Sequence, residues 1–481
     1  MVMNRTMGKA KNHHTQRRFI TVSNRNANVN NCHFTPRATL IGLGVRLEGL
    51  GILKTIGQYV DIQQKVIFDS PLDKLTDGLV TILAGGKGLY EANKRVRSDP
   101  ALQRAFGRER CAEQSVISET FNACTEENVK QMKQALTEIY REHSDGYRHN
   151  YQQQWQLLDL DLHGQPCGPK AAFATAGYFA HQRNRRGRQL GRVWATWYNE
   201  VVVDQLYAGN TVLPTVLQEL VAQAEGVLEL DLARRQRTIL RIDAHGGSQD
   251  DVNWLLERSF QVHTKEYSGI RARQLADSVT TWHDDPHHPG RQVGWVTTPA
   301  TEYSRPVKRI AVRTRKKNGQ WGIGVLISTL SPKLVGHLTG LTREQLADPL
   351  SRLLAYVYFY DLRGGGIETG FKNDNQGLGI TKRNKKRFDA QQMITAFNAL
   401  AHNLLTWFQR DLACRWPAIA QLGLLRLMRD VLHLNGRVFF DDNHSLTTIM
   451  LSVYDPFAKN LACALRHLLQ PWQVVIILDK T

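Results

Sequence analysis

Apolar positions in the first third of the chain recur at the spacing of an α-helix. Over residues 72–94 they lie three and four residues apart, and Thr125 is a suitable N-cap for a helix over residues 126–143. This pattern predicts a mainly helical region over residues 32–150. Residues 1–31 are rich in Asn, Arg, His and Thr and have almost no apolar periodicity, which predicts a disordered basic tail.

Beyond residue 150 the pattern changes to short apolar runs, which are typical of buried strands. Ser248 is a suitable N-cap for a helix that follows the last of these runs. Three strands followed by an alternation of helix and strand are typical of an α/β domain. The strands are predicted over residues 155–162, 189–197, 200–206 and 238–242, with a helix over residues 211–230.

Residues 268–330 return to a β-rich pattern, which we interpret as an insertion. Two alternating runs flank Asn318 and Gly319, a residue pair typical of a tight β-hairpin. Helical periodicity resumes at Thr342 and is longest over residues 390–412. A final apolar run over residues 474–478 is compatible with one last strand.

The charge balance points to the kind of partner. The 481 residues include 62 Lys and Arg against 44 Asp and Glu, a formal net charge of +18. Such an excess favours a polyanion, because cations that neutralise phosphates release condensed counterions. The longest apolar runs fall far short of the roughly 18 residues that span a bilayer, and no apolar signal-peptide core follows the basic start. We therefore expect a folded protein without membrane contact, in the cytoplasm and associated with the nucleoid.

Three acidic residues, Asp161, Asp243 and Glu368, stand where predicted strands or helices end. Carboxylates at the ends of neighbouring strands can converge although they are far apart in sequence. Such a trio suits Mg²⁺, which prefers oxygen ligands, and two such ions about 4 Å apart promote phosphodiester chemistry. An Asp near a strand end is also commonly a turn-former or an N-cap, so spacing alone leaves both interpretations open.

The surroundings of Glu368 are more specific. Tyr360, Arg363 and the three glycines at 364–366 precede it, and a basic block over residues 382–387 follows. Glycines beside cations favour a backbone that approaches an anion such as DNA closely. A flexible hinge beside a solvated basic face is the alternative. A second basic cluster enters a predicted strand and contains Arg183, Arg185, Arg186, Arg188 and Arg192.

Six ordered motifs together resemble bacterial insertion-sequence transposases of the DDE type, in the branch with a β-rich insertion and a Tyr-Arg-Glu signature. The resemblance covers most of the chain from about residue 72 onward. It implies an α/β, ribonuclease H-like catalytic domain over residues 151–267 and 341–481, ending in helices and interrupted by the insertion at 268–340. The motifs are DLDLHG (159–164), NRRGRQLGRVWA (184–195), LYAGNT (206–211), ILRIDAHGG (239–247), VNWLLERSFQV (252–262) and YDLRGGGIETGFKNDNQGLGITKRNKKRF (360–388).

The resemblance also implies roles for individual residues. Asp161, Asp243 and Glu368 would be the catalytic acids that hold two Mg²⁺ ions, for which Mn²⁺ can substitute. Asp159 lies on the same strand face two residues before Asp161 and stays an alternative for the first acid. Arg363, with Tyr360, would hold a phosphate near the scissile bond.

The implied partner is double-stranded DNA, both transposon ends and target. A homodimer would form in the synaptic complex, and the helical region 32–150 would bind the ends and help to dimerise. The residues expected to contact DNA are Tyr360, Arg363, Lys372, Lys382, Arg383, Lys385, Lys386, Arg387, Arg185, Arg186 and Arg188.

The chain departs from the family's pattern at a few positions. His163 stands where the family often has Thr, and Asn375 stands at a position where it has Lys. Four residues separate Arg363 from Glu368, where three are common. Lys372 or Lys382 would then substitute for the missing Lys.

Two other functions fit the same residues. One is a catalytically silent DNA-binding protein derived from a transposase, and the other is a structure-specific nuclease of the same fold. The basic clusters serve all three functions, whereas the intact acids favour an active enzyme. Trp282, Trp295 and Trp321 lie in the insertion, where related transposases stack an aromatic ring on a displaced base. For any single one of them, core packing is the favoured interpretation.

Overall fold

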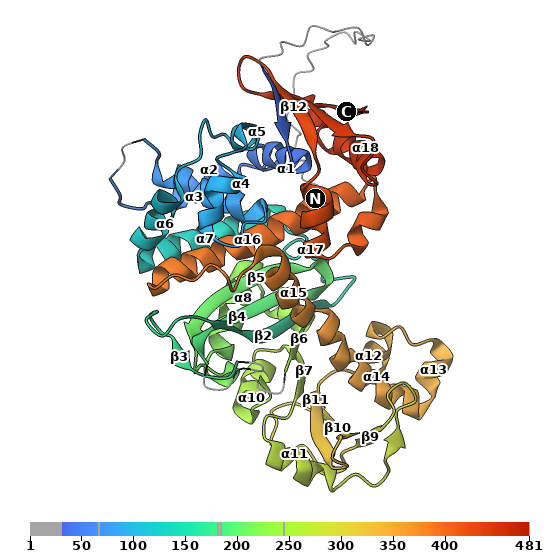
Figure 1. Cartoon of the computed structure of the whole chain (residues 1–481). Helices are drawn as coiled ribbons and strands as arrows, with labels where there is room; N and C mark the ends of the chain where they lie inside the picture. The colour runs from blue at the N-terminus through green and yellow to red at the C-terminus, as the bar shows by residue number, and fades with distance from the viewer. Residues whose placement is uncertain (1–30, 66–67, 180–181, 183–184, 244–245, 481) are drawn as a thin grey trace, which may run out of the picture.

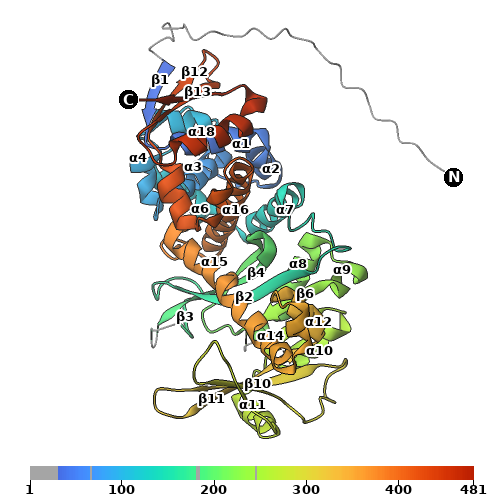
Figure 2. The same ribbon diagram turned by 90° about the vertical axis from the view of Figure 1, so that its right-hand side faces the viewer.

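The computed structural model describes residues 31–65, 68–179, 182, 185–243 and 246–480. Its elements form three bodies along one long axis (Figure 1). A helical body at one end contains the first and last described strands, a mixed sheet with flanking helices lies in the middle, and strands and helices of the β-rich segment lie at the other end (Figure 2). The fold is mixed α/β, as predicted. The tail predicted over residues 1–31 lies, apart from Asn31, outside the described residues.

The helices predicted in the first third of the chain are confirmed. The Ser70 hydroxyl accepts a hydrogen bond from the Asp73 N–H, and the Thr125 hydroxyl accepts one from the Asn128 N–H. The longest two helices of this region therefore begin with a capping box, which satisfies their first backbone N–H groups. The helices are α1 (Ala38–Gly49), α2 (Ile52–Tyr59), α3 (Pro71–Leu83), α4 (Ala92–Arg95), α5 (Pro100–Ala105), α6 (Gln114–Ala123) and α7 (Glu126–His143).

The first and last described strands meet in one four-stranded sheet, of which the sequence pattern predicts only the last strand, over residues 474–478. The first strand pairs with a strand from the far end of the chain, with Cys32 opposite Phe439. A four-residue strand has no local signal of its own, because its distant partner defines it. The sheet consists of β1 (Cys32–Thr35), β12 (Gly436–Phe440), β13 (Leu446–Ser452) and β14 (Val475–Asp479), with α18 (Ala458–Leu468) packed against it.

Five strands of the central sheet follow the order β5-β4-β2-β6-β7, and the short β3 also pairs with β4. Strand β2 pairs antiparallel with β4, which places Asp161 opposite Arg192, and parallel with β6, which places Leu160 opposite Ile242. The four strands predicted here are confirmed, with shifted ends. The elements are β2 (Gln156–Pro166), β3 (Thr175–Ala176), β4 (Arg186–Ala195), β5 (Glu200–Ala208), α8 (Leu217–Leu228), α9 (Leu232–Gln236), β6 (Thr238–Ile242), α10 (Gln249–Glu257) and β7 (Gln261–Lys265).

The β-rich segment continues this sheet instead of forming a separate one. Strand β11 pairs antiparallel with β7, with Ile327 opposite Thr264. The predicted hairpin is confirmed, because Arg315 lies opposite Trp321 and Gly319 has a φ of 80° in the turn. The elements are α11 (Gly269–Ala276), β8 (His283–Asp284), β9 (Arg291–Trp295), β10 (Lys308–Arg315), β11 (Trp321–Ser328), α12 (Pro332–Leu338), α13 (Arg343–Ala347) and α14 (Pro349–Asp361).

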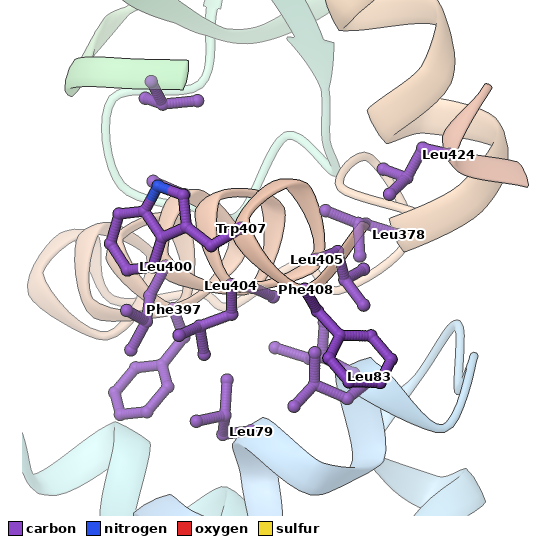
Figure 3. Close-up of a cluster of buried hydrophobic side chains, with 14 of the residues drawn as sticks. Leu79, Leu83, Leu378, Phe397, Leu400, Leu404, Leu405, Trp407, Phe408 and Leu424 are labelled. Atoms are coloured by element: carbon purple, nitrogen blue, oxygen red, sulfur yellow. The ribbon is translucent and has the colours of Figure 1, made fainter. Parts of the chain in front are cut away.

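Helix α16 (Phe388–Ala413) joins the helical body to the central sheet. On one side it presents Phe397 and Phe408 toward Leu79 and Leu83 of α3, in a fully buried core (Figure 3). Burial of such side chains is the main favourable term that holds the two bodies together, at about 1.5–3 kcal/mol for each large apolar group. The short α17 (Leu424–Arg426) packs nearby.

The opposite side of α16 covers the edge of the central sheet. The Asn403 side chain accepts a hydrogen bond from the Val201 N–H and donates one to the Val201 carbonyl. The Gln392 side chain accepts one from the Leu206 N–H. These amides satisfy backbone groups of the edge strand β5 that would otherwise invite another strand. No helix in the described part of the chain is long and apolar enough to cross a membrane.

Candidate active site

The three predicted acids converge, because their elements meet at one edge of the central sheet. Asp161 lies on β2, and Asp243 follows the last residue of the adjacent parallel strand β6. Glu368 is the second residue of α15 (Ile367–Asn373), which packs against β2. Burial raises the pKa of Asp161, and the negative charges of Asp243 and Glu368 raise it further, against the opposing effect of Arg363. The acids therefore lie within electrostatic reach of one another.

The two candidates for the first acid occupy different environments. Asp159 is fully buried, and its two carboxylate oxygens accept hydrogen bonds of 2.7 and 2.8 Å from Arg241. Arg241 also donates to the Phe359 carbonyl at 2.8 Å, so this pair belongs to the interior. Asp161, with 18% of its side chain exposed, borders the open grooves described below. Asp161 is thus the acid that a ligand can reach.

Only one of the three glycines before Glu368 is required for close packing. A Cβ on Gly366 would lie 2.6 Å from the Asp159 carboxylate and 3.4 Å from the Arg241 guanidinium. A Cβ on Gly364 or Gly365 would meet nothing within 4 Å. The chain therefore passes directly over the buried ion pair at Gly366, while the preceding two glycines border open space.

Arg363 lies between two of the acids. Its Nη2 atom is 2.9 Å from an Asp161 oxygen, and its Nη1 atom is 3.5 Å from a Glu368 oxygen. The guanidinium carbon is 5.8 Å from the centre of the Tyr360 ring, and burial raises the pKa of Tyr360 to about 12. The Arg363 Nε atom is buried without a hydrogen-bond partner. Tyr360 and Arg363 therefore lie beside the acids, although the Nε donor of Arg363 has no hydrogen-bond partner.

Two grooves meet at Asp161. One, of about 770 Å³, is lined by Asp243 and by the basic residues Arg185 and Lys382. The other, of about 380 Å³, is lined by Glu368 and Lys372. Both grooves therefore combine carboxylates at their junction with cations along their walls, and Lys and Arg are the side chains that commonly bind the phosphates of a nucleic-acid backbone.

The basic residues predicted to contact DNA separate into exposed and interior groups. Arg188 and Arg383 are buried, and Lys385 is half-buried. Arg383 donates to the Asn398 side chain and to the Gly86 and Leu378 carbonyls, and burial lowers its pKa to about 10. These interior cations bind protein oxygens, and of the three only Lys385 keeps partial contact with solvent. The exposed members are Lys372, Lys382, Lys386, Arg387, Arg185 and Arg186.

Arg188 explains how the basic block is held in place. Its guanidinium donates to the backbone carbonyls of Ala172, Lys385 and Lys386. The Lys385 ammonium bonds to Ser118 of α6, and burial lowers the Lys385 pKa to about 8. The interior cations therefore fix the loop that carries the exposed ones.

A buried ion network behind the acids is the main feature that sequence reasoning missed. Asp374 follows α15 in a π-helical turn (Asp374–Leu378) and accepts hydrogen bonds of 2.6 Å from Arg192 and 2.7 Å from His402. Arg192 also forms a two-bonded pair with Asp204, with both distances 2.7 Å. The sequence placed Arg192 in a basic cluster that enters a predicted strand, whereas its position opposite Asp161 and its burial are seen only in the structure. The network ties β4, β5 and α16 to the helix that carries Glu368.

The two unusual residues of the family pattern contact each other. The Nδ2 atom of Asn375 is 2.8 Å from the Nε2 atom of His163. The His163 ring also stacks on Phe371 of α15, with ring centres 4.6 Å apart. Burial lowers the pKa of His163 to about 4, so its ring is neutral at pH 7. This contact joins the strand of Asp161 to the helix of Glu368.

Within the described residues, no three carboxylates, imidazoles or thiols are gathered closely enough to hold a metal ion as they stand. The donor set at the groove junction nevertheless fits Mg²⁺ chemically, because all three acids offer carboxylate oxygens. Glu368, with 56% of its side chain exposed, has room to move toward Asp161. The guanidinium of Arg363 is the group that stands between these two carboxylates.

No protein-family model and no curated protein matches the chain. Among solved structures, it is similar to a piggyBac transposase in a synaptic complex with hairpin DNA, with 11% sequence identity and a TM-score of 0.42. The match covers 83% of this chain and 79% of that one. A similarity this low assigns neither fold nor activity.

Proposed function

We propose that the chain is a DDE-type DNA transposase that cleaves phosphodiester bonds at transposon ends and joins the freed 3′ ends to target DNA. One observation carries the proposal. Asp161, Asp243 and Glu368 are 82 and 125 residues apart in sequence, yet they meet where two cation-lined grooves join. A groove in which neighbouring carboxylates and burial raise the pKa of an acid, as at Asp161, is typical of a site built for chemistry.

The order of the central strands supports a ribonuclease H-like catalytic domain. Strands β5, β4 and β2 are antiparallel neighbours, and β6 and β7 add in parallel on the other side of β2. Asp161, in the middle of β2, and Asp243, after the end of β6, directly follow the last parallel pair of these strands, Leu160 with Ile242. They therefore lie at the carboxyl end of β6, and open α/β sheets bind their ligands at such ends. Strands β8 to β11 lie between Asp243 and Glu368 in the chain, as the resemblance implies for a β-rich insertion.

The carboxylates of Asp161, Asp243 and Glu368 would hold two Mg²⁺ ions, which when bound supply activation of the attacking oxygen and stabilisation of the leaving oxygen. The side chains along the grooves position the DNA. Lys382 on one groove and Lys372 on the other would bind phosphates on either side of the scissile bond. Catalysis then depends mainly on positioning and charge neutralisation.

The proposed reaction has two phosphoryl transfers in one pocket. Water first attacks the phosphodiester at the transposon end and releases a 3′-hydroxyl group. That hydroxyl then attacks a phosphodiester of the target strand. A structure-specific nuclease of the same fold would carry out only the first transfer, so joined products distinguish the two functions.

The test is a pair of Asp→Asn variants incubated with Mg²⁺ and supercoiled plasmid that carries the DNA flanking the coding sequence. Asp243→Asn is expected to abolish cleavage and joining while gel-shift binding to the same DNA persists. Asp250→Asn, an exposed acid in the first turn of α10, is the matched control and is expected to cut normally. Undiminished cutting by Asp243→Asn would refute the assignment, and wild-type protein that binds without cutting would indicate a silent DNA-binding protein.

A further inference from the structure

Arg363 occupies the place where the proposed metal ligands face each other. It forms an ion pair with Asp161 at 2.9 Å and a weaker one with Glu368 at 3.5 Å. Only 5% of its side chain is exposed. Each of these acids therefore already has a counter-ion, and it comes from the protein itself.

A divalent cation and this guanidinium compete for the same oxygens. Asp161 uses its Oδ2 atom to accept from Arg363 and its Oδ1 atom to accept from the Leu162 N–H. A cation bound at Asp161 would bring like charges within a few ångströms of each other in a half-buried site, where the repulsion is only weakly screened. Binding of one cation must therefore weaken binding of the other.

The surroundings of Arg363 suit a side chain that can leave Asp161 and Glu368 and bind another group. Its Nε atom is buried without a hydrogen-bond partner, although buried donors are normally satisfied. It lies in a single 3₁₀ turn (Leu362–Gly365), and Gly364 and Gly365 border open space. Open space therefore lies beside the two residues that follow Arg363, whereas Gly366 is packed against Asp159.

We infer that Arg363 is the resident counter-ion of the pocket, that a divalent cation displaces it from Asp161 and Glu368, and that the released guanidinium binds a DNA phosphate. This inference rests on the proposed function, because it needs the acids to be the metal site. A guanidinium matches a phosphate as well as it matches a carboxylate, since it can form two parallel hydrogen bonds with either.

The exchange links metal binding to DNA binding. A cation that frees Arg363 makes a phosphate-binding group available, and a phosphate that holds Arg363 makes the carboxylates available. By thermodynamic reciprocity, each ligand strengthens the binding of the other by the same factor. Without DNA, the pocket holds divalent metal weakly, which limits cleavage of phosphodiesters that are not correctly seated.

The test measures Mn²⁺ affinity of the full chain without DNA, by calorimetry and by the electron paramagnetic resonance signal of free Mn²⁺. Arg363→Gln is expected to bind Mn²⁺ more tightly than wild type, by roughly 5- to 150-fold, the usual range for such couplings. Arg363→Lys, whose single ammonium bridges two carboxylates less well, is expected to be intermediate. Arg291→Gln frees the carboxylates of Asp285 and Asp361 outside the pocket and is the matched control, expected at wild-type affinity.

The outcomes separate this inference from the proposed function. The exchange is overturned if Arg363→Gln binds Mn²⁺ equally well or more weakly than wild type and Arg363→Lys is also unchanged, with both variants folded by circular dichroism. That result would leave the metal site in place. Addition of Asp161→Asn to Arg363→Gln is expected to remove the gained affinity. The metal site itself would be overturned by a different result. In that case neither wild type nor any variant binds Mn²⁺, and none of the acid variants loses cleavage.

Discussion

Two assemblies of charged side chains lie on either side of α15, and they are built in opposite ways. In the sealed network, defined by Arg192, Asp204, Asp374 and His402, every side chain is buried and the closest ion-pair distances are 2.6–2.7 Å. His402 places its second ring nitrogen 2.9 Å from the Asn199 carbonyl. Although burial opposes ionisation, His402 and Arg192 hold the pKa of Asp374 below its usual value.

In the open pocket, defined by Asp161, Asp243, Glu368 and Arg363, ion pairs and hydrogen bonds compensate the charges less completely. Burial raises the pKa of Asp161 in spite of Arg363, the Arg363–Glu368 distance is 3.5 Å, and the Arg363 Nε atom has no partner. The sealed network thus favours the charge of Asp374, although burial still raises the pKa of Asp204, whereas the pocket leaves the Asp161 carboxylate poorly compensated. The first arrangement suits a structural tie, and the second suits a site that awaits a cationic ligand.

The largest expected effect comes from removing a charge of the sealed network. Asp374→Asn leaves Arg192 and His402 without their shared carboxylate, and it is expected to lower the free energy of unfolding by about 3–5 kcal/mol. Asp161→Asn is expected to change it by less than about 1 kcal/mol, because burial already disfavours the ionised form at that position. Urea unfolding followed by circular dichroism compares the two variants. Equal losses would remove the distinction between the two assemblies.

The glycines between Arg363 and Glu368 differ in how closely they pack against the protein interior. Gly366→Ala would force a methyl group to 2.6 Å from the Asp159 carboxylate, and it is expected to destabilise the fold by about 1–3 kcal/mol through overpacking. Gly364→Ala meets no neighbour within 4 Å and is expected to stay within about 0.5 kcal/mol of wild type. Thermal unfolding of both variants is the measurement. If Gly366→Ala does not lower the stability of the fold, the backbone at Gly366 is not held against the Asp159–Arg241 ion pair.

The buried His263 predicts that the stability of the fold depends on pH. His402 has a carboxylate partner, whereas burial lowers the pKa of His263 from 6.5 to about 3, with the Arg241 charge adding to the effect. Because the unfolded chain then binds the proton more readily, stability due to His263 is complete above pH 6.5 and is lost as the pH falls toward 3. At pH 5.5 the loss is about 1.4 kcal/mol.

The pH prediction is measured by urea unfolding of wild type and His263→Gln at pH 7.5 and pH 5.5. Wild type is expected to lose about 1.4 kcal/mol more than the variant between these two values, because glutamine cannot take up a proton. Parallel losses in the two proteins would mean that His263 is not held neutral by the fold.

The smallest effect on stability is expected at an exposed cation of the groove. Lys382→Gln should leave unfolding unchanged but reduce the slope of log affinity for DNA against log salt concentration by about 1, the value for one lost phosphate contact. The neighbouring Arg383→Gln should lower the free energy of unfolding and leave the salt dependence of DNA binding unchanged, because Arg383 is buried against protein carbonyls. Fluorescence anisotropy at several salt concentrations decides between them. An unchanged slope for Lys382→Gln would exclude this lysine from the DNA path.

Much of the central region could be predicted from local patterns. The apolar run at 238–242, the N-cap at Ser248 and the hairpin turn at Gly319 all depend on residues close in sequence, and each is found where it was expected. Asp243 follows the end of its strand as expected, whereas β2 continues to Pro166 and places Asp161 in the middle of the strand. The sealed network could not be predicted in this way, because Arg192 meets Asp374 only when distant segments pack together.

Local residue patterns were enough to predict the helices of the first third of the chain, the strands of the central sheet, the candidate acids and the excess of cations, since propensity, periodicity and charge are carried by neighbouring residues. Only the tertiary structure decided that Asp159 is buried while Asp161 borders the grooves. It also decided that Arg383 serves the interior beside an exposed Lys382, and that Arg363 lies on the acids. The physical reason is that burial and ion pairing depend on the distance between segments far apart in the chain, which residue type and spacing do not specify.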